Sequence, residues 1–267
     1  MAETSCHGLV EFGLPLISKD DPSFATLVSD ILRLPGPGPA PPTLGSEQAA
    51  VLLNKTGKAI VAVEWFWRYT SRDGSMRTSR FSNLGSSAQR DVLKGRSKVG
   101  RDLGTFILSG SKRLITEHGL FGNNLDVLTS EELPRVQGYC GGWGGGNSSQ
   151  SNETEQATVE LVLDLVILEN GLCLGPNESA LYEAINESLD IQQKAAQEAA
   201  TALQSGAAVG RVFEIIRPLA RQHRHSRAAL PSFGNEAIHH LINANDTDLL
   251  AVFKSAAEPR SLALRRA

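Results

Sequence analysis

Residues 158–168 contain the longest alternation of apolar and other side chains in the chain, and this segment most limits the fold. Under a period of two, one face is apolar throughout: Val159, Leu161, Leu163, Leu165 and Ile167. The opposite face begins polar, with Glu160 and Asp164, and ends apolar. Successive side chains of a β-strand point to opposite faces, so the pattern predicts a strand with one face on a hydrophobic core.

The period of the apolar pattern changes after this strand. Glu169-Asn170-Gly171 suits a tight turn, because asparagine and glycine tolerate a positive φ, and residues 172–174 return as a short strand. Gly175-Pro176-Asn177 then interrupts the sheet, and apolar residues recur at helical spacing from Leu181 to Leu203. We therefore expect a sheet domain over residues 1–175 and a helical region over residues 176–267.

Several short strands precede residue 158. We expect an edge strand at 8–18, a helix at 21–32, and strands at 49–54, 59–70, 76–81, 105–108 and 112–116. The buried face of the longest of these contains Val61, Val63, Trp65, Trp67 and Tyr69. Asp73-Gly74 closes a hairpin, and the Arg- and Ser-rich strand after it is expected at a solvated edge. Strands joined by hairpins predict an α+β protein with an antiparallel, immunoglobulin-like β-sandwich followed by a C-terminal helical region.

Two connectors divide the sheet domain. A Pro-rich connector covers residues 34–45, where proline excludes helix and sheet. A Gly-rich loop covers residues 117–157, which show little apolar periodicity. In the helical region we expect helices at 178–204, 209–222, 235–244 and 247–256, followed by a frayed basic tail at 260–267.

The net charge of −3 gives no overall field that favours nucleic acid or anionic membranes. No secretory signal is visible, and no apolar run reaches the roughly 20 residues of a membrane helix, so we expect a cytoplasmic protein without membrane contact. The three cysteines are scattered, which favours reduced thiols. Six asparagines, including Asn54, Asn177 and Asn245, lie in Asn-x-Ser/Thr sequences. Asn177 and Asn245 suit helix N-caps, an explanation preferred to glycosylation.

Residues 137–143 (QGYCGGW) resemble the papain-type sequence around the catalytic nucleophile. In that resemblance Cys140 occupies the place of the structural cysteine, and the nucleophilic cysteine between Gly142 and Trp143 is absent. Without that thiolate no covalent step follows. The glycine run at 144–146 also lacks the Gly-Lys-Ser/Thr of a phosphate-binding loop. A Gly-rich surface loop is the preferred interpretation.

Histidines form two pairs, His223 with His225 and His239 with His240, in a grouping that zinc sites use. Arginines flank the first pair and oppose a dication, and adjacent residues of a helix point about 100° apart. We therefore predict no metal site, and no motif indicates a cofactor.

A basic stretch at residues 217–227 supplies candidate phosphate-binding residues, Arg221, Arg224 and Arg227. Nucleic-acid binding is disfavoured, because no aromatic side chain is interleaved to stack bases. Glu160 and Asp164 lie roughly 13 Å apart along one strand, which is too far for an acid–base pair. These carboxylates are expected to mark the solvent side of the sheet, or to pair with Arg68 or Arg113.

Residues 117–157 are the expected contact region of a non-catalytic binding or scaffolding module, whose partner is a protein. The candidate ligand-binding residues there are His118, Asp126, Tyr139 and Trp143. The alternatives are a hydrolase-type enzyme, in which His118, Asp126 and Cys140 converge near that loop, and a phosphate binder through 217–227. The Ala-rich face of residues 191–203 suggests a homo-oligomer through the C-terminal helices.

Overall fold

The computed structural model describes residues 3–33, 48–84, 87–100, 105–117, 119–122, 124, 127, 156–222, 233–242 and 248–267. The chain forms two compact units. The sheet unit consists of residues 1–83, 98–177 and 265–267, and the helical unit of residues 84–97 and 178–264. Each unit therefore combines segments that are distant in the sequence.

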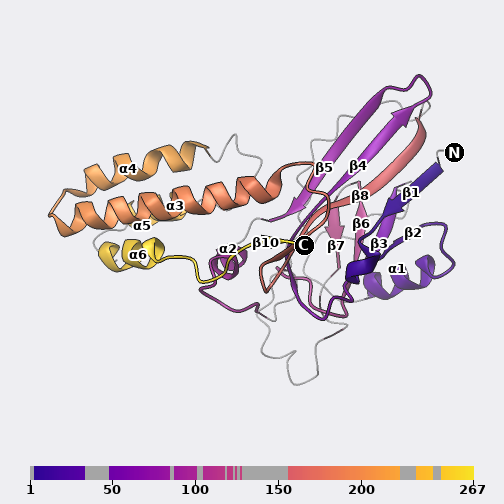
Figure 1. Cartoon of the computed structure of the whole chain (residues 1–267), viewed down its shortest axis with the longest axis horizontal. Coiled ribbons are helices and arrows are strands. Elements are labelled where there is room, and N and C mark those ends of the chain that lie inside the picture. Colours follow the sequence, from indigo (N-terminus) through magenta and orange to yellow (C-terminus); the bar gives the residue numbers. More distant parts are fainter. Residues whose placement is uncertain are drawn as a thin grey trace. The chain divides into compact units, whose positions relative to one another are not determined.

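The larger sheet of the sheet unit has six strands in the order β10-β9-β8-β4-β5, with β1 also paired to β8 (Figure 1). Its strands are β1 Glu3–His7, β4 Ile60–Ser71, β5 Met76–Asn83, β8 Gln156–Leu168, β9 Leu172–Leu174 and β10 Arg265–Arg266. β4 and β8 pair along most of their length and form the centre of the sheet. β5, at one edge, pairs with β4 over its whole length.

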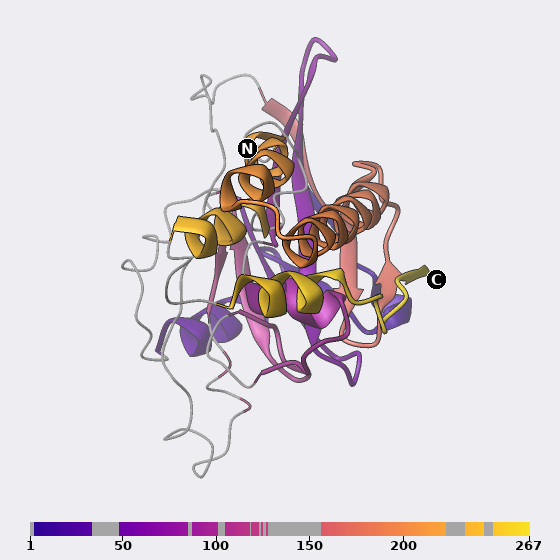
Figure 2. The same ribbon diagram turned by 90° about the vertical axis from the view of Figure 1, so that its left-hand side faces the viewer.

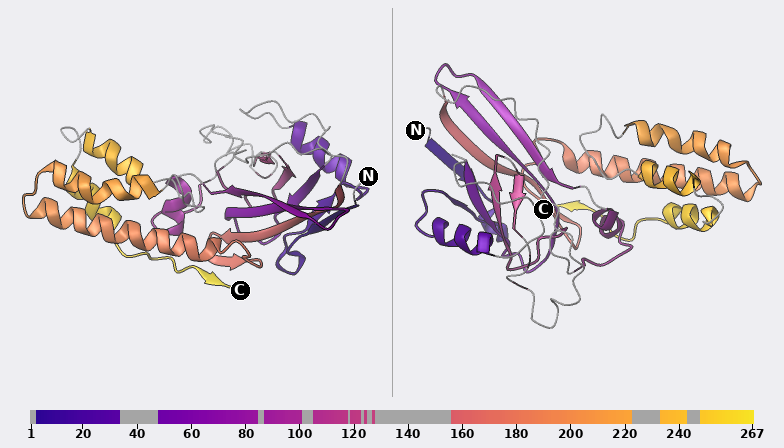
Figure 3. Two further views of the ribbon diagram at one scale, coloured as in Figure 1. Left: turned by 90° about the horizontal axis from the view of Figure 1, so that it is seen from above. Right: turned by 180° about the vertical axis from the view of Figure 1, so that it is seen from behind.

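The smaller sheet has four strands in the order β2-β3-β6-β7. They are β2 Leu16–Ser18, β3 Ala49–Leu53, β6 Lys112–Thr116 and β7 Gly119–Phe121. One face of this sheet packs against helix α1 (Phe24–Arg33), in a cluster of Phe24, Val28, Ile31, Ala49, Val51 and Leu114. Alternate residues of β3 and β6 enter a core that is shared with the larger sheet. Helix, small sheet and large sheet thus form successive layers (Figure 3).

The main core lies between the two sheets and contains four of the five residues predicted for the buried face of residues 59–70. Val61, the fifth, is buried outside this core, which contains Ile60 instead, and the pairing of β4 with β8 shifts between Ile60 and Ala62. Val63, Trp65, Trp67 and Tyr69 of β4 are buried in it together with residues of β3, β6 and β8. The ring of Trp65 stacks on that of Phe81, with centroids 5.7 Å apart. Large aromatic side chains on alternate positions of a central strand bury enough apolar area to hold two sheets together.

The alternation of β8 breaks at Asp164. Trp65 of β4 pairs with Leu163, whereas the preceding residue Glu64 pairs with Leu165. Asp164 is therefore an extra residue without an opposite partner in β4, which defines a β-bulge. One extra residue exchanges the two faces of the strand beyond it.

The bulge corrects two expectations. Val166 and Leu168, in place of Leu165 and Ile167, enter the main core, so the single apolar face predicted from Val159 to Ile167 ends at Leu163. Asp164 is fully buried and does not mark a solvent side. For Glu160, the expected pairing with an arginine of a neighbouring strand is confirmed, because its carboxylate accepts a hydrogen bond of 3.0 Å from Arg68.

The structure is α+β with two sheets, and the immunoglobulin-like plan is not confirmed. β1 runs parallel to β8 and β10 runs parallel to β9, whereas the prediction was purely antiparallel. β3 and β4 follow each other in the chain but lie in different sheets. The two parallel pairings join the chain's ends to its middle, and no local turn signal marks such long-range contacts.

Other elements differ from the predictions in extent. Residues 8–18 hold a 3-10 turn, η1 (Val10–Phe12), and only the short β2. Residues 105–108 form no strand and contribute one bridge, between Ile60 and Ile107. Helix α2 (Ser87–Leu93) lies between the strands predicted at 76–81 and 105–108, where no element was predicted.

The structure describes part of the predicted Gly-rich loop and the predicted C-terminal tail, but not the predicted Pro-rich connector. Within the Gly-rich loop predicted at 117–157, residues 119–121 form β7 and β8 begins at Gln156. Residues 128–155 of that loop, and the whole Pro-rich connector at 34–45, lie outside the described residues. The tail predicted to fray at 260–267 is ordered by pairing, since Arg265 and Arg266 form β10, which pairs in parallel with Leu172 and Cys173 of β9.

The helical unit is built on the long helix α3 (Leu181–Gln204) (Figures 1 and 2). Its other long helices are α4 Val209–Gln222, α5 Phe233–Ile242 and α6 Leu249–Ala257. Pro218 lies within α4, which continues for four residues beyond it to Gln222. None of the helices in the described part of the chain is both long and apolar enough to cross a membrane.

The Ala-rich face of α3 is buried inside the helical unit. Ala196, Ala199 and Ala200 belong to the unit's core, where they meet Val212 of α4 and Phe253 of α6. Small side chains allow neighbouring helices to approach closely. This face therefore packs within the helical unit, and the predicted homo-oligomer through the C-terminal helices stays a prediction.

The N-cap prediction for Asn177 is wrong. Helix α3 begins after Ala180, which has a φ of 56°, and the hydroxyl oxygen of Ser179 accepts a hydrogen bond of 3.3 Å from the Leu181 amide. Asn54, another asparagine of the Asn-x-Ser/Thr sequences, is fully buried, and its side-chain amide donates to the carbonyl groups of Lys58 and Ile107. Asn54 thus has a structural role in the folded protein.

Candidate functional site

Most residues predicted to bind a ligand lie outside the described part of the chain. These are His118, Asp126, Tyr139, Trp143, Arg224 and Arg227, and the same holds for Cys140 and Asn245. Arg221 lies in the last turn of α4, and the structure does not describe its side chain. The contact region at 117–157 and the phosphate patch at 217–227 therefore stay predictions.

A buried polar network lies beside β6 and was not anticipated from the sequence. The side-chain oxygen of Asn124 accepts hydrogen bonds from the Ser111 hydroxyl (2.8 Å), the Leu108 amide (3.2 Å) and the Arg113 guanidinium. The side-chain amide of Asn124 donates to the carbonyl of Phe106 (2.9 Å). Every polar atom of the Asn124 side chain thus connects segments of the sheet unit, which indicates a structural role.

Two thiols are described, and both are poor nucleophiles. Burial raises the pKa of Cys6 to about 11, with a smaller contribution from the Asp20 carboxylate. Burial likewise raises the pKa of Cys173 to about 11. A nucleophilic cysteine needs the thiolate, which these surroundings disfavour at neutral pH.

We expect Cys6 and Cys173 to react with iodoacetamide at pH 8 about 100-fold more slowly than an unhindered thiol. The pKa increase from 9.0 to about 11 lowers the thiolate fraction by that factor. Mass spectrometry of tryptic peptides after timed alkylation measures each site separately. Equal rates for the native and the urea-unfolded protein would contradict the assignment.

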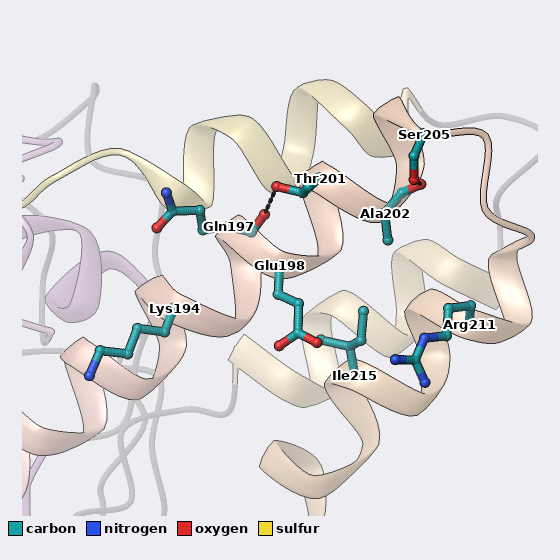
Figure 4. Close-up of a pocket in the computed structure, with 8 residues that line it drawn as sticks. All are labelled: Lys194, Gln197, Glu198, Thr201, Ala202, Ser205, Arg211 and Ile215. Carbon is teal, nitrogen blue, oxygen red and sulfur yellow. Dashed lines mark hydrogen bonds between the residues drawn. The ribbon is translucent and has the colours of Figure 1, made fainter.

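An open groove lies between α3 and α4 in the helical unit (Figure 4). Its volume is about 540 Å³, and it is lined by Lys194, Gln197, Glu198, Thr201, Ala202, Ser205, Arg211 and Ile215. The hydroxyls of Thr201 and Ser205 donate to backbone carbonyls of α3 itself. Glu198 points towards Ile215, with Arg211 beyond it (Figure 4). The lining therefore brings no nucleophile together with a base.

The outer face of the larger sheet, which points away from the main core, carries rows of polar side chains. Ser5, Glu160, Arg68 and Thr78 lie side by side across β1, β8, β4 and β5. Glu160 accepts from Arg68 at 3.0 Å and lies 3.6 Å from the His7 ring nitrogen. The Arg68 guanidinium also covers the ring of Phe66 at 5.1 Å. These contacts order the face, and partial exposure keeps the ion pairs weak.

The end of β4 and the whole of β5 form a basic hairpin, defined here as residues 68–83. It carries four arginines (Arg68, Arg72, Arg77 and Arg80) and one carboxylate, Asp73. Arg72 and Arg80 are exposed. Arg77 is half-buried, with its guanidinium 4.5 Å from the centre of the Tyr69 ring. In a protein of net charge −3, this hairpin is a local concentration of positive charge.

The turn of the hairpin is well defined. The carboxylate of Asp73 accepts a hydrogen bond of 2.9 Å from the Ser75 amide, and this bond holds the pKa of Asp73 below its usual value. Gly74 adopts a φ of 84°, which suits glycine. The turn therefore joins β4 and β5 in register, from Thr70 opposite Met76 onwards.

The described residues hold no cluster of three or more histidine, cysteine or carboxylate groups placed to share a metal ion. His239, one of the predicted pair, is exposed on α5. The sequence contained a signal for the basic hairpin, because arginines at 68, 72, 77 and 80 flank the turn Asp73-Gly74. From that signal we predicted only a strand at a solvated edge of the sheet. Comparison of the chain with protein-family models, with curated proteins and with solved structures finds no match.

Proposed function

We propose that this protein is a non-catalytic binding module and that the basic hairpin is its contact surface for an acidic protein segment. The observation that carries the proposal is that exposed positive charge and a strand at the sheet edge occur in the same hairpin. Arg72 and Arg80 project into solvent from a hairpin whose second strand lies at the edge of the larger sheet. Positive surface patches raise the association rate and the specificity for acidic partners.

A binding role fits the chemistry of this surface better than catalysis does. The Glu160 carboxylate accepts a hydrogen bond from Arg68, and the Asp73 carboxylate accepts one from the Ser75 amide in the turn. The aromatic side chains of Phe66 and Tyr69 are buried under arginines. Apart from Met76, which is 69% exposed, and the turn residue Asp73, the exposed side chains of the hairpin are cationic or hydrogen-bonding, which suits recognition of carboxylates. The alternative of a hydrolase near residues 117–157 rests on residues outside the described part of the chain.

A protein partner is favoured over nucleic acid. Single-stranded nucleic acids bind proteins through exposed aromatic platforms as well as positive charge. Tyr69 and Phe81 of the basic hairpin, and Phe66 just before it, are all buried, with exposed fractions of 6% or less. The hairpin offers guanidinium groups and backbone, which match carboxylate side chains on an extended peptide.

Reversing two charges on the hairpin is expected to abolish most binding of an acidic probe. The probe is a fluorescent peptide of alternating glutamate and threonine, titrated by anisotropy at low salt. We expect the Arg72→Glu/Arg80→Glu variant to bind at least about tenfold more weakly than the unaltered protein, because two attractive pairs become repulsive. Both residues are exposed, so the stability of the fold is expected to change little.

The matched control reverses two charges at the opposite end of β4. Lys55 and Lys58 are exposed on the turn that precedes this strand. The strand has 12 residues, so this turn lies about 40 Å from the hairpin turn. The Lys55→Glu/Lys58→Glu variant has the same net charge and is expected to bind the probe almost normally. Equal losses in the two variants would show that only net charge matters and would overturn the proposed surface.

A further inference from the structure

The outer edge of β5 has no neighbouring strand among the described elements. β5 pairs residue by residue with β4, from Met76 opposite Thr70 to Asn83 opposite Val63, and stands last in the order of the larger sheet. A strand paired on one side directs the N–H and C=O groups of every second residue towards its other side. β5 therefore presents a row of backbone donors and acceptors along its edge.

Within its described residues, this edge lacks three features by which proteins protect an edge strand: proline, lysine and a bulge. Its sequence, MRTSRFSN, contains no proline or lysine. Its pairing with β4 shows no register shift, whereas the pairing of β4 with β8 shows three. Edge strands are commonly blunted by proline, by lysine or by bulges. β5 is instead long and regular, and arginine supplies its charge.

The arginines select which strand the edge accepts. Arg77 and Arg80 lie on opposite faces of β5, because Arg77 is opposite the core residue Tyr69 and Arg80 is opposite Phe66 on the outer face. A second copy of β5 would bring the same positive charges to the edge and would be repelled. A strand with glutamate or aspartate would place carboxylates beside these guanidinium groups.

We infer that the acidic partner segment binds by adding an extended strand to the edge of β5, so that the larger sheet gains one strand from another protein. This inference rests on the proposed function and states its mode of binding. Main-chain hydrogen bonds supply affinity in such strand addition, and the alternating side chains supply specificity. A nucleic acid could satisfy the arginines but not the row of backbone groups.

The test compares two probes of identical charge. One is the peptide of alternating glutamate and threonine, and the other is the same peptide with every backbone nitrogen methylated. N-methylation preserves the carboxylates and removes all backbone N–H donors. Strand addition predicts a loss of affinity of about tenfold or more for the methylated peptide, since several hydrogen bonds are lost together. It also predicts slower hydrogen exchange of β5 amides in the complex with the unmethylated peptide.

The remaining outcomes separate the two proposals. Equal affinity of both peptides, each weakened by Arg72→Glu/Arg80→Glu, would overturn strand addition and leave the basic hairpin as an electrostatic binding surface. Absence of binding by either peptide at low salt would overturn both proposals. Tighter binding of single-stranded oligonucleotides than of the acidic peptide would overturn the protein partner. Concentration-dependent dimerisation with protection of β5 would show that the edge accepts a second copy instead.

Discussion

The Gly175→Ala variant is expected to unfold with a free energy about 3 kcal/mol lower than that of the unaltered protein. Gly175 has a φ of 109°, a region that residues with a Cβ rarely adopt. A Cβ at this position would lie 2.5 Å from the carbonyl oxygen of Asp164, the bulged residue of β8. Neither atom can move easily, because the backbone of residue 175 fixes the position of the Cβ and the oxygen is itself a backbone atom of β8. Urea unfolding followed by the fluorescence of the buried Trp65 and Trp67 measures the effect.

The matched control for this prediction is Gly74→Ala in the hairpin turn. Gly74 has a φ of 84°, but a Cβ there would meet no atom within 4 Å. Only the conformational penalty of about 1 kcal/mol is expected. If the two variants lost equal stability, the close approach of Gly175 to Asp164 would carry no energetic weight.

The Asn124→Ala variant is expected to lose about 3 kcal/mol of unfolding free energy. Asn124 is fully buried and accepts hydrogen bonds from Ser111, Leu108 and the Arg113 guanidinium. Arg113 is itself 1% exposed. The substitution removes the acceptor that the Ser111 hydroxyl, the Leu108 amide and the Arg113 guanidinium share. Desolvation of such groups costs more than a normal hydrogen bond contributes.

Asn170→Ala provides the comparison for this second variant. Asn170 is exposed in the turn before β9, and its side chain accepts only the Leu172 amide at 3.2 Å. Water replaces that acceptor when the side chain is shortened, so a loss of about 1 kcal/mol or less is expected. Comparable losses for Asn124→Ala and Asn170→Ala, measured by the same urea titration, would refute the structural role of the buried network.

The candidate surface was only partly predictable from the sequence. The arginine spacing and the Asp73-Gly74 turn identified a charged hairpin at a solvated edge, which is where β5 lies. Exposure of Arg72 and Arg80, and cover of Tyr69 by Arg77, depend on which strands lie beside them. The preferred ligand-binding candidates from the sequence lie outside the described part of the chain and stay predictions; they are His118, Asp126, Tyr139 and Trp143.

What the sequence by itself determined is local. The period of two in β4 and β8, the helical period of α3, and the glycine and asparagine turns between them are properties of neighbouring side chains on a backbone of defined geometry. Those signals located β3, β4, β5, β6, β8 and β9, together with α1, α3, α4, α5 and α6.

Only the tertiary structure decided the long-range pairings. The parallel addition of β1 and β10, the bulge at Asp164 and the separation of β3 from β4 each join residues far apart in the chain. Such contacts form because they complete the burial of apolar side chains and the pairing of backbone groups for the whole unit. No short segment contains that balance, and for the same reason only the folded chain shows that β5 stands last among the described strands of the larger sheet.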